Sequence, residues 1–540
     1  MAAHSAVWAE GQADSDSSLA IKNVTVISMA DADVHRGQTV VVQDGRIAEI
    51  GPSEQVRPPS GAIVVDGTGR YLIPGLADMH AHVSSDSELL LYVAHGVTRI
   101  RNMWGSHTSL AMRARSDSGV ITAPRILTAG RLVDGSPPLW GETSASVTDP
   151  ETARVIMDEE QEAGFDFLKV YETLSAETFD AIAAHAADIG HPFGGHVPRS
   201  VPLERALRSG MHTIEHNSGW GPATRVYRPR GPDEGREVLQ GIARGDTGWE
   251  RLFDLDRTRE LAELAAESGV WHVPTLSWHA GAYVSRRQAQ DRFARAGMES
   301  MSPRVLAAWD PAANPGLQSL SDETLEAFQT LLAIEQIRTK ALHDAGAPLL
   351  LGTDAPNPFV PTGAAVHEEL ALLVEAGLTP FEALQTATSA VADFLGDSTV
   401  GTIAPGHLAD LVLIDGNPLE NISATREIAG VVLRGRWLAR DTLDSLLQRA
   451  VASYDAPDEW SGDAAPTDGA DANRYTIKFD SLEIGAEWVA EHRTPDTVAT
   501  EGRRTTLTIT GGLVTESVRI EETADGAFLG LTYQQTTTSG

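Results

Sequence analysis

The chain has 540 residues, which is too long for one simple core and predicts a large catalytic-size domain with one or two smaller ones. Its formal charge of −33 at pH 7 argues against nucleic acid and against an anionic membrane as partners, because both require basic surfaces. The chain contains no cysteine, so any bound metal must be held by histidine, carboxylate or a modified lysine. No apolar run approaches the roughly 18 residues of a helix inserted across a membrane.

Strand-like runs with turn signals occupy both ends of the first 440 residues. Residues 1–18 lack the basic and apolar regions of a signal peptide and are expected to form a disordered leader. The compartment is left open between the cytoplasm and, if the leader is a processed remnant, the periplasm or the exterior. Residues 19–70 are too few to close a core, and similar runs return at 398–440. We therefore expect one small composite β-sandwich domain built from these two segments.

Between residues 71 and 397, strand-like runs alternate with segments of helical periodicity such as 149–164 and 323–346. The strand-like runs are LADMHAHV, VTRIRNM, RILTAGRLV, FDFLKVYE, HPFGGHV, HTIEHN, VWHVPTLSW and PLLLGTDAP. This alternation predicts an α/β fold, a (β/α)8 barrel of the TIM type, whose sites lie at the C-terminal ends of the strands. An open doubly wound sheet would need a glycine-rich phosphate loop after its first strand, and the sequence has none there.

Residues of metal-binding type fall inside or at the ends of these strand-like runs. They are His80 and His82 in the first run, Lys169 in the fourth, His196 in the fifth, His216 in the sixth and Asp354 in the eighth. His80 and His82 alternate on a strand and therefore point to the same face. Taken singly, each residue has a structural explanation; Asp354, for example, could be a helix N-cap. Their common position in barrel order instead predicts one metal site at the top of the barrel.

The motifs PGLADMHAHV, LKVYE, GGHV, IEHN, LLLGTDAP and GTIAPGHLADLVLIDGNPL together resemble the metal-dependent amidohydrolase superfamily, in particular its imidazolonepropionase-like and prolidase-like members. The resemblance covers residues 19–440 and implies a binuclear centre of two divalent metal ions, with zinc as the expected metal. It implies these ligands: His80, His82 and Asp354 for the first ion, His196 and His216 for the second, and a carboxylated Lys169 as the bridge. Imidazolonepropionases lack that lysine, so the chain looks more like the prolidase-type branch.

The chemistry that this resemblance implies is hydrolysis of an amide-type C–N bond by a hydroxide that bridges the two ions. The expected substrate is a small molecule such as a dipeptide, an N-acyl amino acid or a cyclic amide. Asp354 is expected to accept the proton of the hydroxide and pass it to the leaving group. Tyr171 lies two residues after Lys169, and it is either a donor to the developing oxyanion or a core tyrosine.

Other functions remain open at this point. A lactonase or a phosphotriesterase could use the same binuclear site, because the site activates water and leaves the electrophile to the pocket. A binding protein without catalysis is the third alternative, and the presence of all the expected ligands argues against it. The sequence leaves the substrate and the oligomeric state open, a homo-oligomer included.

Long insertions follow the sixth and seventh strand-like runs, at about 218–260 and 279–322. Loops at the top of such a barrel set specificity, so these insertions are expected to shape the substrate pocket. Three residues in or beside them are candidates to line it: Arg228, Trp278 and His279.

The last part of the chain differs in composition from the rest. Residues 455–473 are rich in acidic and small residues and predict a flexible linker. Residues 474–540 alternate in the manner of antiparallel strands and predict a β-rich C-terminal extension. No residue pattern in that extension indicates catalysis.

Overall fold

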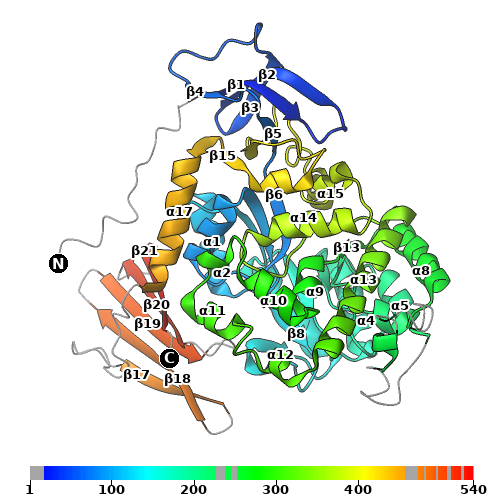
Figure 1. Ribbon diagram of the computed structural model, residues 1–540. Helices are drawn as coiled ribbons and strands as arrows, with labels where there is room; N and C mark the ends of the chain where they lie inside the picture. The colour runs from blue at the N-terminus through cyan, green and yellow to red at the C-terminus, as the bar shows by residue number, and fades with distance from the viewer. Residues whose placement is uncertain are drawn as a thin grey trace. The chain divides into compact units, whose positions relative to one another are not determined.

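The computed structural model describes residues 18–226, 237–241, 244, 252–455 and five strands between residues 472 and 538 (Figure 1). Nearly all of the expected leader, most of the acidic linker and the candidate pocket residue Arg228 lie outside the described residues. The chain divides into two compact units. One consists of Met1–Met301 and Trp309–Val451, and the other of Ser302–Ala308 and Ala452–Gly540.

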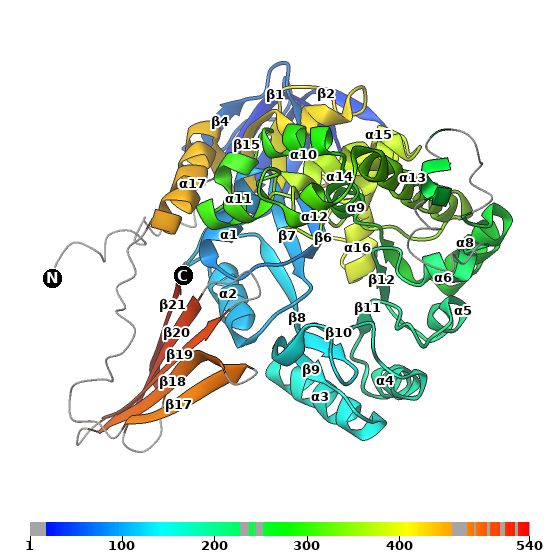
Figure 2. The same ribbon diagram turned by 60° about the horizontal axis from the view of Figure 1, so that its bottom comes forward.

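The larger unit contains a sheet of parallel strands in the order β13-β12-β11-β10-β8-β7-β6, with the short β9 paired to β8. The strands are β6 (Leu76–Ala81), β7 (Val97–Asn102), β8 (Arg125–Asp134), β9 (Ser144–Ser146), β10 (Phe167–Val170), β11 (Phe193–Gly195), β12 (Thr213–Glu215) and β13 (Trp271–Val273). Every residue of β6 and of β10 is buried, as expected for parallel strands covered on both faces. Figure 2 shows these strands side by side around an arc.

Residues 348–355 lie between the two edge strands of this sheet and nearly close the barrel. On one side, the backbone N–H of His272 in β13 donates to the carbonyl of Pro348 (2.9 Å). On the other, the N–H of Met79 in β6 donates to the carbonyl of Leu351 (2.8 Å). The sequence predicted a (β/α)8 barrel, and the α/β fold with a barrel of parallel strands is confirmed, although the barrel is only nearly closed.

The eighth strand itself differs from the prediction. The run PLLLGTDAP was expected to form a regular strand, but its residues make only isolated bridges, Leu349 to His272 and Ala355 to Ala81. Asp354 adopts a left-handed φ of 60°, which extended backbone does not allow, so the segment cannot run as a regular strand through this residue. The chain bends at Asp354, and the single bridge of Ala355 to Ala81 follows the bend.

Helices follow most of the barrel strands, and α3 packs beside β10 and α4 beside β11. The helices are α1 (Asp86–Ala94), α2 (His107–Asp117), α3 (Pro150–Ala163), α4 (Ala176–Ile189), α5 (Leu203–Leu207), α6 (Trp220–Thr224), α8 (Leu255–Ser268), α9 (Leu276–Ala282), α10 (Arg286–Phe293), α11 (Pro303–Trp309), α12 (Pro315–Ser319), α13 (Asp322–Ala345), α14 (Ala365–Glu375), α15 (Pro380–Thr386), α16 (Ser389–Leu395) and α17 (Arg440–Ala452). Sequence signals explain their ends. The long α13 begins where the Ser321 side chain accepts from the Thr324 N–H, and it ends at Gly346 in the left-handed region.

A second sheet of the larger unit runs in the order β16-β15-β14-β5-β1-β2-β3, with β4 paired to β1. Its strands are β1 (Leu19–Ile27), β2 (Val34–Gln43), β3 (Arg46–Pro52), β4 (Ile63–Asp66), β5 (Tyr71–Pro74), β14 (Leu411–Ile414), β15 (Ile428–Leu433) and β16 (Arg436–Ala439). β5 joins the two halves, because it pairs in parallel with β1 and antiparallel with β14. One continuous sheet thus contains strands from both segments, and its assignment as a separate β-sandwich domain stays a prediction.

The smaller unit contains a five-stranded antiparallel sheet in the order β17-β18-β19-β20-β21. Its strands are β17 (Ala472–Phe479), β18 (Leu482–Arg493), β19 (Thr497–Leu507), β20 (Leu513–Thr523) and β21 (Phe528–Thr538). Each strand pairs with the next one along the chain, which makes the sheet a simple meander. Among the helices that the structure describes, none has both the length and the apolar character that a membrane crossing requires.

Candidate metal centre and active site

His80, His82 and Asp354 form a compact group where β6 meets the barrel-closing segment. His82 Nε2 lies 2.8 Å and His80 Nε2 lies 3.2 Å from Asp354 Oδ1. One ligand atom from each of the three residues lies within 4.8 Å of the others. Gly352 permits this approach, because a Cβ there would meet the Cβ of His80 at 2.6 Å. Two imidazoles and one carboxylate are a donor set that zinc accepts.

His196 and His216 extend this group across the barrel top. The ring of His216 lies 4.4 Å from that of His80 and 4.8 Å from that of His196, measured between centroids. His216 Nε2 lies 4.0 Å from Asp354 Oδ2. His196 follows β11 and His216 follows β12, so adjacent strands deliver the two rings.

Lys169 is buried on β10, with 2% of its surface exposed. Gly195 of the neighbouring β11 has a φ of 134°, and a Cβ there would meet the Lys169 side chain at 2.9 Å. Burial lowers the pKa of Lys169 to about 8, against the opposing influence of the Glu215 and Asp354 carboxylates. Burial is the largest cause that lowers the pKa values of three histidines of the group, and the charge of Lys169 lowers them further. These histidines are His82, His196 and His216. The structure thus brings the predicted ligands to one place.

The protonation states of the group suit a bound cation. Burial lowers the pKa of His196 to about 4 and holds that of His216 well below its usual range, so both rings are neutral at pH 7. Burial alone would raise the pKa of Asp354, but its interactions with the rings of His216, His80 and His82, hydrogen bonds included, hold it well below its usual value. Neutral imidazoles and an ionised carboxylate are the forms that coordinate metal ions.

A buried ion pair behind His80 escaped the sequence analysis. Glu215 Oε2 lies 2.7 Å from His80 Nδ1, and the other oxygen accepts from Arg101 Nη2 at 2.5 Å. Burial would raise the pKa of Glu215, but the charges of Arg101 and His80 hold it well below its usual range. The sequence did contain a signal, because Glu215 stands inside the strand-like run HTIEHN, where a carboxylate is costly to bury without a partner. The hydroxyl of Thr213 also donates to Glu215 (2.6 Å).

His196 and His216 are oriented in the same manner. His196 Nδ1 lies 3.3 Å from Glu172 Oε1, and His216 Nδ1 lies 2.7 Å from Thr275 Oγ1. As in His80, the Nδ1 atom is occupied and Nε2 is left to face the group. Such partners fix the ring and its tautomer in metal sites.

An unpaired ring nitrogen shows whether a metal ion fits here. Among the described residues, His80 Nε2 is buried, lies 3.2 Å from Asp354 Oδ1 and finds no hydrogen-bond partner of good geometry. An unpaired buried polar atom costs free energy of folding, and a coordinated metal ion removes that cost. The residues therefore fit a divalent metal ion.

Aromatic residues surround the histidines. The ring of Tyr171 lies 4.2 Å from that of His196, and burial raises the pKa of its hydroxyl to about 12. Trp278 on α9 lies 5.5 Å from the ring of His216. The neighbouring His279 is 4% exposed and lies 4.7 Å from the Trp278 ring. Tyr171 and Trp278 therefore contact the group directly, and His279 lies one ring further out.

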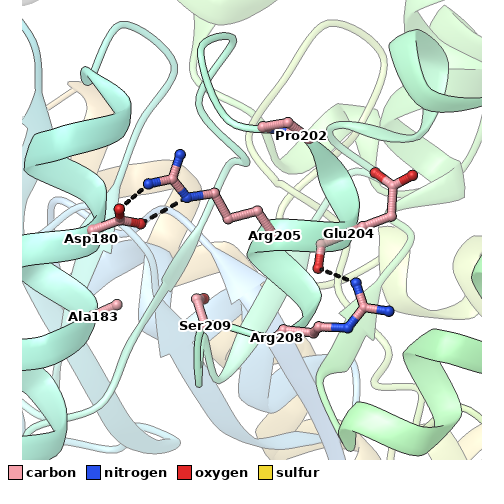
Figure 3. A pocket seen from close by; sticks show the side chains of 7 residues that line it. All are labelled: Asp180, Ala183, Pro202, Glu204, Arg205, Arg208 and Ser209. Carbon is pink, nitrogen blue, oxygen red and sulfur yellow. Dashed lines mark hydrogen bonds and ion pairs between the residues drawn. The ribbon is translucent and has the colours of Figure 1, made fainter.

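A separate cleft of about 640 Å³ opens on the outer side of the barrel, between α4 and α5 (Figure 3). Its arginines already have partners, because Arg205 pairs with Asp180 across the cleft and Arg208 Nη1 donates to the Glu204 carbonyl (3.4 Å). None of the predicted site residues lines it. We therefore do not assign chemistry to this cleft.

Comparison with known proteins adds an independent finding. The model of the "Amidohydrolase family" matches residues 253–438. An imidazolonepropionase of Salinispora arenicola (strain CNS-205) is 24% identical over 395 residues, which are 71% of this chain and 86% of that protein. An adenine deaminase of Chelativorans sp. (strain BNC1) is 26% identical over 303 residues, 52% of this chain. The chain spans only 42% of the length of that deaminase.

Similarity to solved structures extends over more of the chain. The structure described as "AH, Bottromycin amidohydrolase" is 29% identical and superposes with a TM-score of 0.64. The match covers 80% of this chain and 90% of that one.

Proposed function

We propose that the chain is a member of the amidohydrolase superfamily and a metal-dependent hydrolase that cleaves an amide-type C–N bond in a small substrate. The observation that carries this proposal is the convergence of His80, His82 and His216 on the carboxylate of Asp354 at the top of the barrel. The relatives support the bond type, since their names describe a deaminase, an imidazolonepropionase and an amidohydrolase.

We assign two divalent metal ions to the site, with zinc as the expected metal. The proposed ligands are His80, His82 and Asp354 for one ion, His196 and His216 for the other, and a carboxylated Lys169 between them. When bound, such ions polarise a substrate carbonyl and lower the pKa of the attacking water. Support for the lysine modification is that Lys169 is buried beside these ligands, where a carbamate would replace a repelled ammonium by two oxygens and a negative charge.

The protein's own residues supply the proton transfers. We assign Asp354 to accept a proton from the water as its oxygen attacks the carbonyl carbon. The same carboxyl group then gives that proton to the leaving nitrogen as the C–N bond breaks. Tyr171 is assigned as the hydrogen-bond donor to the carbonyl oxygen as it becomes negative, a role that its pKa of about 12 permits across the neutral range.

A substrate screen tests the proposal. The zinc-loaded protein is assayed against dipeptides, N-acyl amino acids, cyclic amides, lactones and phosphotriesters, with Asp354→Asn prepared in parallel to exclude contaminating activity. We expect turnover of at least one amide class and its loss in the variant. Turnover confined to lactones or phosphotriesters would overturn the assigned bond type.

A further inference from the structure

Three aromatic side chains, Trp104, Trp140 and Tyr171, form what we call the aromatic arc. They follow β7, β8 and β10, which are neighbours in the sheet. The rings of Trp104 and Trp140 lie 5.7 Å apart, and the Trp140 side chain is near enough to the Tyr171 hydroxyl to oppose the rise of its pKa that burial causes. The arc is therefore continuous from one loop to the next.

Both ends of the aromatic arc contact proposed metal ligands. Trp104 lies 6.3 Å from the ring of His82, and Tyr171 lies 4.2 Å from the ring of His196. The histidine rings connect these two ends on the other side, because His82 contacts His80, His80 contacts His216 and His216 contacts His196. The aromatic arc therefore borders the proposed metal centre.

The backbone holds Trp104 in place from both directions. The N–H of Met103 donates to the carbonyl of Ala81 (2.9 Å), and the N–H of Gly105 donates to the carbonyl of Gly130 (2.9 Å). A Cβ on Gly105 would meet the carbonyl oxygen of Ala129 at 2.1 Å, so only glycine allows this close approach to β8. The position of Trp104 is thus fixed by β6 and β8.

Trp140 is equally well held although it is 40% exposed. Asp134 Oδ2 accepts from the N–H of Leu139 (2.9 Å), and the hydroxyl of Thr143 donates to the carbonyl of Trp140 (2.6 Å). Asp134 Oδ1 also accepts from the N–H of Thr173 (2.7 Å), which ties this loop to the one after β10. The exposed indole is therefore presented on a fixed backbone.

A scattered exposed apolar side chain needs no explanation in a soluble protein. Trp140 differs because its indole is fixed, forms part of a ring of contacts with the proposed ligands, and adjoins Leu139, itself 46% exposed. A flat apolar surface held beside a reaction centre gains free energy when a ligand covers it. A cationic group would also suit aromatic faces, but the two divalent ions proposed at the neighbouring histidines would repel it.

We propose that the aromatic arc is a substrate subsite for a neutral aromatic or flat apolar group next to the scissile amide. This inference rests on the proposed function and specifies its substrate class. Since Tyr171 belongs to the arc, the apolar group lies beside the carbonyl that Tyr171 is assigned to polarise. The favoured substrates are thus small amides or dipeptides with an aromatic side chain adjacent to the cleaved bond.

The test compares two neutral amides that differ only by a phenyl ring, 3-phenylpropanamide and propanamide. Their binding to the zinc-loaded protein is measured by titration calorimetry, and turnover of Phe-Ala, Ala-Phe and Ala-Ala is measured in parallel. We expect the phenyl compound to bind at least about tenfold more tightly, which corresponds to about 1.4 kcal/mol. Trp140→Ala and Trp104→Ala should each reduce that ratio to less than about threefold.

Two matched variants show whether the loss of preference comes from the aromatic ring of Trp140 or from the loss of a large side chain in general. Trp140→Phe keeps a flat aromatic ring but loses the five-membered ring with its N–H, so it should retain part of the preference that Trp140→Ala abolishes. Trp437→Ala makes the same large deletion in β16 of the other sheet, where the indole covers Gly430, and it should leave the preference unchanged. Thermal midpoints show whether each variant is folded.

The outcomes distinguish the two proposals. An unchanged phenyl preference in both Trp→Ala variants, or tighter binding of 3-phenylpropylamine than of the neutral amide, would overturn the subsite. Amide turnover without any aromatic preference would also overturn the subsite but would leave the proposed function in place. A phenyl preference that depends on the arc, in a protein that hydrolyses no amide, would support the subsite and overturn the function.

Discussion

Glu215 Oε2 lies 2.7 Å from His80 Nδ1 in the interior of the barrel, where neither side chain is accessible to solvent by more than 1%. Glu215→Gln should weaken zinc binding by about tenfold to a hundredfold, because the amide removes the charge that orients His80. A competition titration with a chromophoric chelator measures the change. Glu172→Gln is the matched control at the half-buried partner of His196, and an equal loss there would contradict a special role for Glu215.

Lys169→Ala should lower the bound metal from about two ions per chain toward one or none and remove nearly all hydrolysis. The reason is that the variant lacks the proposed bridging carbamate, and a short carboxylic acid should partly restore activity by occupying the vacated space. Metal analysis of the purified variant gives the result directly. Lys340→Ala removes an exposed lysine paired with Asp344 and should keep both ions. Two ions and near-normal turnover in Lys169→Ala would refute the bridge.

Tyr171→Phe should lower kcat by about 10²- to 10³-fold while KM changes little, because the proposed hydrogen bond strengthens only as the carbonyl oxygen becomes negative. Steady-state kinetics on the best amide from the screen measures both constants. Tyr283→Phe, on a half-buried tyrosine stacked against His279 (5.7 Å), serves as the control. If kcat is unchanged in Tyr171→Phe, Tyr171 is a packing residue.

Glu335→Ala should destabilise the fold by about 3–5 kcal/mol, because it leaves Arg338 buried without its partner. Arg338 Nη1 donates to Glu335 Oε1 (2.5 Å), and Glu335 also accepts from Asn217, the residue after His216 (3.1 Å). Urea denaturation measures the free energy of unfolding. The double variant Glu335→Leu/Arg338→Met should recover much of the loss, and a double variant as unstable as the single one would disprove the explanation.

The buried carboxyl group of Glu160 should make the free energy of unfolding depend on pH. Burial raises its pKa from 4.5 to about 8, so between these values the folded chain binds a proton that the unfolded chain has released. The stabilisation is therefore complete below about pH 4.5 and is lost as pH rises toward about 8, at up to about 1.4 kcal/mol per pH unit. Glu160→Gln removes the titration, so its stability relative to wild type should rise from pH 5 to pH 8. Denaturation at both pH values checks this, and a constant difference would contradict it.

Local sequence signals predicted the regular elements well. The helix expected at 323–346 is observed as Asp322–Ala345, because a serine N-cap and a terminal glycine mark its ends. The strand-like runs that carry the candidate ligands were recognisable because buried parallel strands are continuously apolar. Their side chains come together in the structure, while their role as ligands stays a prediction.

Features that depend on contacts between segments far apart in the sequence were not predictable. Trp104 and Trp140 stand in loops without periodicity, and their contact depends on the register of β7 and β8. The Arg101–Glu215 pair joins residues that are 114 positions apart, and the sequence around either residue does not indicate which residue it pairs with. The irregular eighth strand was not predicted either, because nothing in the run PLLLGTDAP marks the left-handed φ that Asp354 adopts.

The closure of the barrel by residues 348–355 has a consequence for the order of events during folding. His82 and Asp354 are 272 positions apart in the chain, and they meet only when this segment has docked between the first and last strands. Contacts of such long range form late, since their loop entropy must be overcome before they contribute. A nascent chain that has not yet emerged beyond residue 348 therefore presents the histidine pair without its carboxylate. Metal uptake should mark completion of the barrel, and a zinc-sensitive probe added during refolding would time that last step.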